Sequence, residues 1–302
     1  LASQPVKPAW VVAGRLGLHF LLLWLPLVVV TIIAVFAAQP ANVSLASVSG
    51  EPACWLLLAA AYLLFWQALA AWANFQKLSA AGNALALCGT WLVFVLLVPA
   101  LVQVAVRMTA PAPDRLGLVL AQRDVDIALH KRADTVRDAF YARYNYEPPK
   151  VALNEYDTFY VGNILPRAFA ADDALSASLD EIDRRRQLQS WRTGQLAWLS
   201  SALAFRRATE QLAGVSPVQQ GIIIQKARAF QKRWRAHFGA KLASMTPLTV
   251  QDYDTKPEPP VVQVPFAERL RSALSALVAV LIASGIALGW AVATARKSRA
   301  SA

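Results

Sequence analysis

The amino-acid sequence predicts an all-α membrane protein, with four transmembrane helices in this chain and a large, mainly helical extracytoplasmic domain between the third and the fourth. The composition is one reason, because 56% of the 302 residues are hydrophobic and only 16% are charged, whereas soluble domains average about 25% charged residues. The second reason is four long runs without Asp, Glu, Lys or Arg: residues 16–50, 52–76, 78–106 and 272–295. Each run exceeds the roughly 20 apolar residues that a helix needs to cross a bilayer core.

The ends of the runs set the expected boundaries of the spans. Gln39-Pro40-Ala41-Asn42 is typical of a helix end followed by a loop, so the first span ends at about Ala38. A Lys, Arg or Asp at the centre of a span costs about 2.5–3.5 kcal/mol, which makes the uncharged runs informative. We therefore expect transmembrane helices at residues 16–38, 52–74, 83–106 and 267–295, with a segment 1–15 before them and a tail 296–302 after them.

Basic residues in the short flanks predict the orientation of the spans. The connection 39–51 has no Lys or Arg, whereas the opposite ends of the spans carry Lys7, Arg15, Lys77, Arg296, Lys297 and Arg299. Short loops rich in Lys and Arg stay in the cytoplasm. Both ends of the chain are therefore expected in the cytoplasm, and residues 108–266 outside it.

The segment 108–266 carries helical periodicity and no convincing pair of strands. A first helix is expected from Asp114, which follows Pro113, to about Asn145. A second is expected over residues 175–212, and Ser216-Pro217 predicts the start of a third, which runs to Phe238. Five prolines within residues 246–265 favour an extended linker into the last span.

Charge and cysteine content exclude several classes of protein. The net charge is +11, but the segment 108–266 holds 21 Lys and Arg against 17 Asp and Glu. This spread leaves no concentrated basic patch, so we expect no nucleic-acid partner. Two cysteines exclude a disulfide scaffold and a cysteine-rich metal site. Cys54 and Cys88 fall near opposite ends of their spans and are expected to be small buried hydrophobic residues.

Motifs for catalysis, metal or nucleotide binding are missing. The sequence has no G-x-x-x-x-G-K-[ST], no H-E-x-x-H and no C-x-x-C, so we expect a non-catalytic subunit without metal or cofactor. His19 in the first span is either functional or a packed neutral side chain. The acid pairs Asp172-Asp173 and Asp180-Glu181 are either reactive carboxylates or a solvated helix face. The basic runs 184–186 and 232–235 either bind anionic head groups or form charged helix faces.

Several segments together resemble the permeases of the type-2 (exporter) class of ABC transporters. Residues 1–8 and 11–15 are similar to the cytoplasmic coupling segment of that class, and residues 81–87 and 97–101 to the following family block. Pro111-Ala112-Pro113-Asp114-Arg115 resembles the P-x-P-S-R start of an external helix, with Asp in place of Ser. Residues 198–203 and 211–215 resemble the S-P-A-L and L-A-G-T blocks. The likeness is to the branch with a C-terminal domain of unknown function, and it covers nearly the whole chain.

The resemblance implies the C-terminal portion of a six-helix permease in the bacterial cytoplasmic (inner) membrane, which moves a substrate by ATPase-driven alternating access. Implied partners are a cytoplasmic ABC ATPase dimer that binds ATP and Mg, a second permease chain, membrane lipids and a further protein in the periplasm. The expected ATPase contacts, with ordinary positive-inside loops as the alternative, are Gln4, Pro5, Val6, Lys7, Phe75, Gln76, Lys77 and Leu78. Pro111, Pro113, Asp114 and Arg115 have structural roles in the family motif.

Two other functions stay open at this point. A membrane-anchored sensor or assembly factor with an extracytoplasmic helical domain has the same architecture, although only residues 296–302 follow the last span as a cytoplasmic output. A membrane enzyme requires a cluster of ionisable residues in or near the lipid, and His19 alone lies there.

Overall fold

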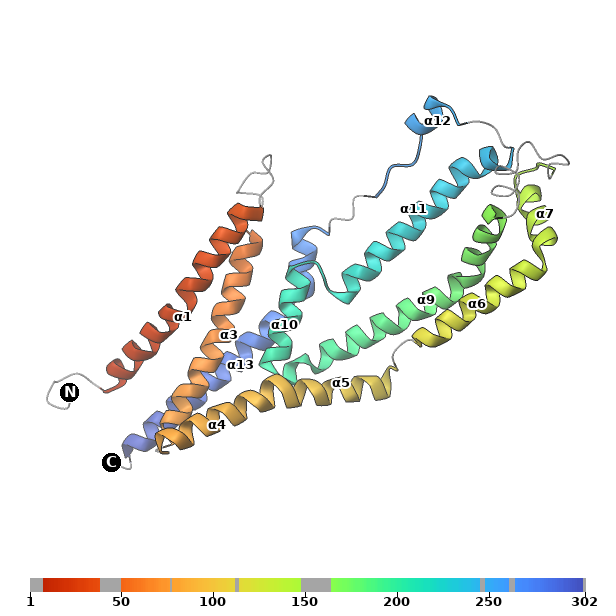
Figure 1. The fold of residues 1–302 in the computed structure, drawn as a ribbon. Coiled ribbons are helices and arrows are strands. Elements are labelled where there is room, and N and C mark those ends of the chain that lie inside the picture. Colours follow the sequence, from red (N-terminus) through yellow and green to blue (C-terminus); the bar gives the residue numbers. More distant parts are fainter. Residues whose placement is uncertain are drawn as a thin grey trace. The chain divides into compact units, whose positions relative to one another are not determined.

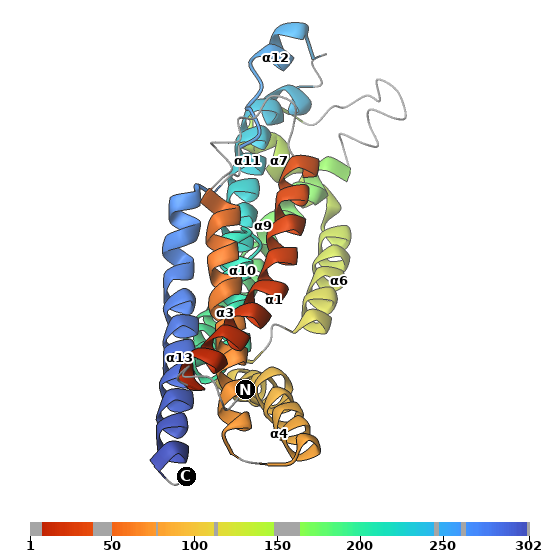
Figure 2. The same cartoon turned by 90° about the vertical axis from the view of Figure 1, so that its left-hand side faces the viewer.

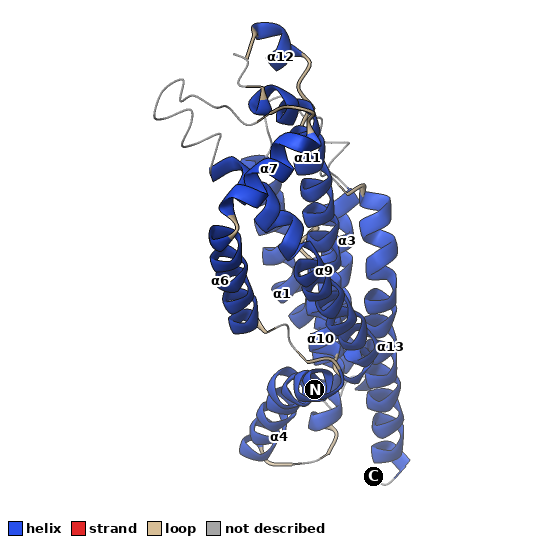
Figure 3. Ribbon diagram, turned by 90° about the vertical axis from the view of Figure 1, so that its right-hand side faces the viewer, coloured by secondary structure: helices blue, strands red, loops and turns tan. Residues whose placement is uncertain are grey.

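The computed structural model describes residues 8–38, 50–76, 78–111, 114–147, 164–244, 248–260 and 264–300. Helices account for most of these ranges (Figure 1), and no β-strand occurs within them (Figure 3). Among the same residues, four helices are long and apolar enough to cross a membrane: Gly14–Ala37, Gly50–Asn74, Ala80–Thr109 and Phe266–Arg296. The chain is an all-α, multi-pass membrane protein, and this fold class confirms the prediction.

Each expected span lies within a helix that extends past it. The first and second belong to α1 (Pro8–Ala38) and α3 (Gly50–Asn74). The third belongs to α4 (Ala80–Leu92), η1 (Val93–Leu97) and α5 (Val98–Thr109), and the last to α13 (Phe266–Ala300). Helix α13 continues beyond the apolar run to Ala300.

The third span contains a five-residue π-helix, η1, just before Pro99. The backbone N–H of Val98 bonds to the carbonyl of Val93, five residues earlier. The carbonyl of Phe94 would need the N–H of residue 99 in the same pattern, and proline has none. Phe94 is therefore left without a donor inside its own helix.

Contacts divide the chain into two compact units, whose boundaries fall partly within long helices. The membrane unit consists of Leu1–Thr109, Ser190–Gln219 and Val264–Ala302 and holds the four apolar helices. The inserted unit consists of Ala110–Gln189 and Gln220–Gln263. The sequence-based division assigned all of 108–266 to one domain, whereas residues 190–219 pack with the spans. The division depended on the lengths of the runs without charged residues. These lengths do not show which helices pack against each other.

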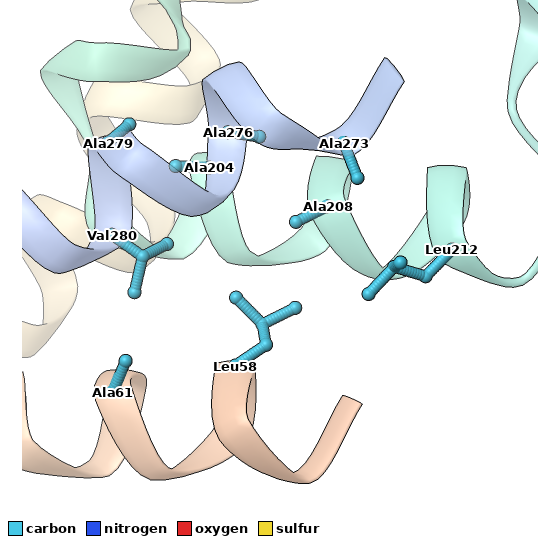
Figure 4. Packing of buried hydrophobic residues seen from close by; sticks show 9 residues of the cluster. All are labelled: Leu58, Ala61, Ala204, Ala208, Leu212, Ala273, Ala276, Ala279 and Val280. Atoms are coloured by element: carbon cyan, nitrogen blue, oxygen red, sulfur yellow. The ribbon is translucent and has the colours of Figure 1, made fainter. Parts of the chain in front are cut away.

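The core of the membrane unit is made by α3, α13 and α10 (Ser201–Leu212), as Figure 4 shows. Its buried side chains are mostly alanine: Leu58, Ala61, Ala204, Ala208, Leu212, Ala273, Ala276, Ala279 and Val280. Small residues let helix backbones approach closely, which is the usual basis of helix association in membranes. Ser284 extends this contact, because its buried hydroxyl donates to the carbonyl of Ala61 at 2.7 Å.

Helix α1 packs beside α3 (Figure 2). It buries little of its own surface. The indole N–H of Trp24 donates to the carbonyl of Leu56 at 3.4 Å. None of the apolar window of α1 is buried, and Leu22, Val30 and Ile33 are each more than 60% exposed. Such a surface suits contact with lipid or with another transmembrane helix.

The inserted unit contains α6 (Arg115–Lys131), α7 (Ala133–Arg143), most of α9 (Leu165–Leu196), most of α11 (Pro217–Ala243) and α12 (Val250–Asp254). The helix expected over 114–145 is thus two helices. They separate at Arg132, whose N–H bonds three residues back to Leu129. The third expected helix continues past Phe238 to Ala243.

Two further differences come from capping residues. The helix expected over 175–212 ends at Leu196 and resumes at Ser201 after the turn η3 (Ala197–Leu199). Ser200 is extended there and accepts the N–H of Leu203, as an N-cap does. The expected linker 246–265 contains α12, which starts with a capping box between Thr249 and Asp252.

Candidate functional site

The predicted ATPase contacts fall partly on a short turn between α3 and α4. Phe75 and Gln76 close the end of α3 through bonds from their N–H groups to Ala71, Trp72 and Ala73. Gln76 is exposed and Leu78 is 50% exposed. Ser79 then caps α4 by accepting the N–H of Gly82. Gln4, Pro5, Val6, Lys7 and Lys77 lie outside the described residues.

This turn is held in place by a pair of amides. Asn83 Nδ2 donates to Asn74 Oδ1 at 3.2 Å, so the last residue of α3 is tied to the first turn of α4. Trp72 and Trp290 also place their rings 5.6 Å apart, which links the same end of α3 to α13. The helix ends on either side of the turn are therefore bonded to each other, and Gln76 and Leu78 between them are exposed.

The family-motif residues lie at the start of α6. Pro111 is exposed, and Asp114 precedes the first helical residue, Arg115, with its carboxylate close to Gly117. A Cβ atom at Gly117 would lie 2.6 Å from Asp114 Oδ2. A carboxylate at this position stabilises the positive end of the helix dipole. Pro113 and the side chain of Arg115 lie outside the described part of the chain.

A charged clasp closes the opposite end of the membrane unit. Arg269, at the start of α13, forms a two-pronged ion pair with Glu51 at the start of α3, with Nη1 at 3.2 Å from Oε2. The same Nη1 donates to the carbonyl of Leu212, the last residue of α10, at 2.8 Å. Arg269 is only 15% exposed. One guanidinium thus joins three helices, and Gly214, with φ +76°, turns the chain beside it.

Ion pairs connect α9 to α11 in the inserted unit. Arg228 bonds to Asp180 at 2.7 Å and to Asp183 at 3.0 Å. Arg235 pairs with Asp172, to which Gln231 also donates at 2.8 Å. Asp172, Asp173 and Asp180 thus pair with arginines of the facing helix while their side chains stay 48%, 57% and 74% exposed, as expected of a solvated helix face. Glu181 pairs along its own helix with Arg184 and Arg185, which lower the pKa of its carboxyl.

An apolar pocket of about 350 Å³ lies between α9, α11 and α12 within the inserted unit. Six lining residues are aromatic or aliphatic: Phe169, Trp234, Phe238, Leu242, Leu248 and Tyr253. Phe238 makes an edge-to-face contact with Trp234 at 4.6 Å and lies 6.3 Å from Tyr253. Pockets of this size and composition are typical of small-molecule sites.

Charged residues at the pocket are all paired. The guanidinium of Arg235 lies over the ring of Phe169 at 4.5 Å while it pairs with Asp172. Burial lowers the pKa of Arg235, which remains charged at neutral pH. Lys241 pairs with Asp252 of α12, and His237 Nε2 lies 3.2 Å from the Asp252 carbonyl. These bonds hold α12, and therefore Tyr253, against α11.

The remaining candidates for chemistry are dispersed. His19 contacts its own helix, with Nδ1 at 2.7 Å from the carbonyl of Arg15, and His130 contacts Arg167. Cys54 is half-buried and Cys88 is exposed, contrary to the expectation that both are buried. Among the described residues, no group of three His, Cys, Asp or Glu side chains is arranged to hold a metal ion.

Comparison with known protein families gives a match for the segment between the third and fourth spans. Residues 115–258 match the family described as Domain of unknown function (DUF3526). No curated protein and no solved structure matches the chain. The matched segment begins at the first residue of α6 and ends shortly before the last apolar helix, so it is inserted between two spans.

Sequence reasoning missed both the clasp and the pocket. Glu51 is the single charged residue in the connection 39–51, and an isolated acid at the start of a span is a signal for a partner. The pocket had a weaker signal, namely Trp234, Phe238 and Leu242 at a spacing of four residues on α11. Their neighbours in space, Phe169 and Tyr253, come from distant segments that no periodicity connects.

Proposed function

We propose that this chain is a transmembrane permease subunit of an ATP-binding cassette transporter in the bacterial cytoplasmic membrane. The observation that carries the proposal is the insertion of the DUF3526-like segment between two spans that pack in one membrane unit. The order of motifs similar to the type-2 exporter permeases supports the same assignment. The chain itself is the non-catalytic part, and ATP with Mg belongs to a separate cytoplasmic ATPase.

The mechanism that suits this architecture is alternating access. Helix α3 has 25 residues, so it reaches about 37 Å from the turn 75–79 to the clasp at Glu51. A rigid helix transmits a displacement at one end to the other. Closure of the ATPase against Gln76 and Leu78 thereby displaces Glu51 and Arg269. The alanine-rich contacts among α3, α10 and α13 allow the helices to shift with little steric resistance.

Co-purification with mass spectrometry tests the assignment. We expect an ATP-binding cassette subunit to co-purify in stoichiometric amount in mild detergent, and Leu78→Asp to abolish that association. Leu116→Asp is the matched control, because Leu116 is also exposed, at 68%, but lies in the inserted unit. Reproducible absence of a cassette subunit, or ATP hydrolysis by the purified chain alone, would overturn the proposal.

A membrane-anchored sensor or assembly factor is the second candidate. The aromatic pocket of the inserted unit favours it, because a ligand-binding external domain is what a sensor requires. The two candidates differ in partner. A sensor or assembly factor retains its function in cells that lack every cassette ATPase, whereas a permease subunit loses it.

A further inference from the structure

The pocket of the inserted unit has the properties of a preformed ligand site. Helix α11 lines it with Trp234, Phe238 and Leu242, and α9 lines it with Phe169. Tyr253 of α12 also lines it, and the bonds of Asp252 to Lys241 and His237 hold α12 against α11. Because separate helices supply fixed walls, little conformational entropy is lost when a ligand enters.

The size and chemistry of the pocket restrict what fits it. A volume of about 350 Å³ is in the range of small-molecule sites and is too small for a helix of another protein. Four of the lining residues are aromatic. Ring–ring contacts in edge-to-face or offset geometry contribute beyond the burial of area, so an aromatic ligand gains more than an aliphatic one.

The charges around the pocket exclude an ionic ligand. Arg235 is already neutralised by Asp172 and lies on the ring of Phe169, and Lys241 is neutralised by Asp252. A charged ligand would lose its hydration on entering an apolar pocket and would meet no unpaired counter-charge among the described residues that line it. A neutral ligand has no such cost.

We propose that this pocket binds a neutral aromatic small molecule. The site is independent of the proposed transport function, since it is defined by residues of the inserted unit alone. The pocket gives the inserted unit a binding activity of its own, for neutral aromatic molecules. Trp234 is the sole tryptophan in residues 110–189 and 220–263, so it reports on the pocket selectively.

Fluorine NMR on the full chain in lipid nanodiscs tests the proposal. Tryptophan is replaced by 5-fluorotryptophan, and Trp234→Phe identifies the resonance of position 234. Three probes share one ring system and differ in charge: 2-naphthalenemethanol, 2-naphthoate and 2-naphthylmethylammonium. We expect saturable perturbation of the Trp234 resonance by the alcohol, and binding of both ions weaker by about tenfold or more.

Variants separate the pocket from partitioning of the probe into lipid. Tyr253→Ala should weaken binding of the alcohol by about tenfold, and Leu248→Ala should act in the same direction. Tyr146→Ala is the matched control, because Tyr146 is 44% exposed and Tyr253 49% exposed, and Tyr146 does not line the pocket. The proposal is overturned by an unperturbed Trp234 resonance at millimolar alcohol, by equal or tighter binding of either ion, or by equal affinity of the Tyr253 and Tyr146 variants.

Discussion

The hydroxyl of Ser200 donates a hydrogen bond of 2.6 Å to the carbonyl of Phe94, 106 residues earlier in the chain. Phe94 is the residue whose carbonyl loses its intrahelical donor to the π-helix and Pro99. Ser200 also caps α10 by accepting the N–H of Leu203 at 3.2 Å. One buried side chain, 1% exposed, therefore completes the backbone bonding of two helices. In a membrane, where water does not supply missing partners, such completion is required.

Replacement of Ser200 by alanine should lower the stability of the membrane unit. The variant leaves the Phe94 carbonyl without a donor and removes an N-cap, so we expect a loss of roughly 1–3 kcal/mol in the free energy of unfolding. Thermal unfolding in detergent measures it. Ser201→Ala is the control: Ser201 is equally buried, at 3%, but its hydroxyl has no partner among the described residues. Equal destabilisation by both variants would contradict the role of the Ser200 bond.

The clasp should depend on the shape of Arg269 as well as its charge. Arg269→Ala leaves Glu51 and the Leu212 carbonyl without their partner, and we expect a loss of roughly 1–3 kcal/mol. The cost stays moderate because Glu51 is 38% exposed and therefore partly hydrated. Arg269→Lys should recover only part of the loss, since an ammonium does not form the two-pronged pair. Arg271→Ala, two residues along at an exposed position, should leave the melting temperature unchanged.

The alanine-rich core of the membrane unit should not tolerate larger side chains. Ala276 is 2% exposed between α13 and its neighbours, so Ala276→Leu should destabilise the membrane unit by roughly 1–3 kcal/mol through overpacking. Ala293→Leu makes the same change at an exposed position of the same helix and should be neutral. The measurement is a comparison of the melting temperatures of the two variants, of which Ala276→Leu should have the lower. A tolerant Ala276 would mean that the three helices do not pack closely there.

Tyr141 should make the stability of the inserted unit depend on pH in alkaline solution. Its side chain is fully buried, and its hydroxyl has no hydrogen-bond partner in the described part of the chain. Burial raises the pKa of Tyr141, and the charge of Arg137 opposes this to a smaller extent. The neutral phenol is favoured in the fold, so its contribution is complete below about pH 10 and is lost as the pH rises through the raised pKa.

Tyr141→Phe is therefore expected to leave the free energy of unfolding at pH 7 unchanged or to raise it by up to about 1 kcal/mol. It should also remove the fall in stability at alkaline pH. Urea unfolding from pH 7 to 11 measures both effects. Tyr146→Phe changes an exposed tyrosine and should alter neither. If the Tyr141→Phe variant lost stability at alkaline pH as the wild type does, another titrating group would have to cause that loss.

The membrane topology can be checked by cysteine labelling in intact cells. In a background without Cys54 and Cys88, Ser178→Cys in the inserted unit should react with an impermeant thiol reagent from outside. Gln76→Cys, in the turn after α3, should react only after the cells are opened. Both positions are exposed, so accessibility of the side chain does not limit either reaction. Reversed labelling would invert the proposed orientation.

The parts of this fold that depend on composition were predictable, and those that depend on contacts between distant residues were not. Uncharged runs predicted the four spans to within a few residues, because the length of lipid to be crossed fixes the length of the helix. The start of α11 followed from Ser216-Pro217, a purely local signal. The packing of α10 against α3 and α13 had no such signal, since alanine is equally compatible with lipid, solvent and helix contacts.

The candidate sites divide in the same way. The turn that contains Gln76 and Leu78 was predicted because Lys77 separates two long uncharged runs, and both residues are exposed at the end of α3. The pairing of Arg235 with Asp172 was not predicted, because it joins helices 63 residues apart in the chain. The sequence does not distinguish arginines and aspartates that contact only water from those that pair with each other.

The π-helix has a consequence for the inheritance of this sequence. Such a segment arises when one extra residue is accommodated in an α-helix, and each residue of an α-helix turns the following ones by about 100°. Deletion of a single residue among 93–97 would therefore restore regular winding and leave Val102 and Val106, now 3% and 5% exposed, facing the same neighbours. Loss of one residue in this stretch should therefore be accepted over generations more readily than loss of one residue in α4 or α5, where it would turn all following residues by about 100°.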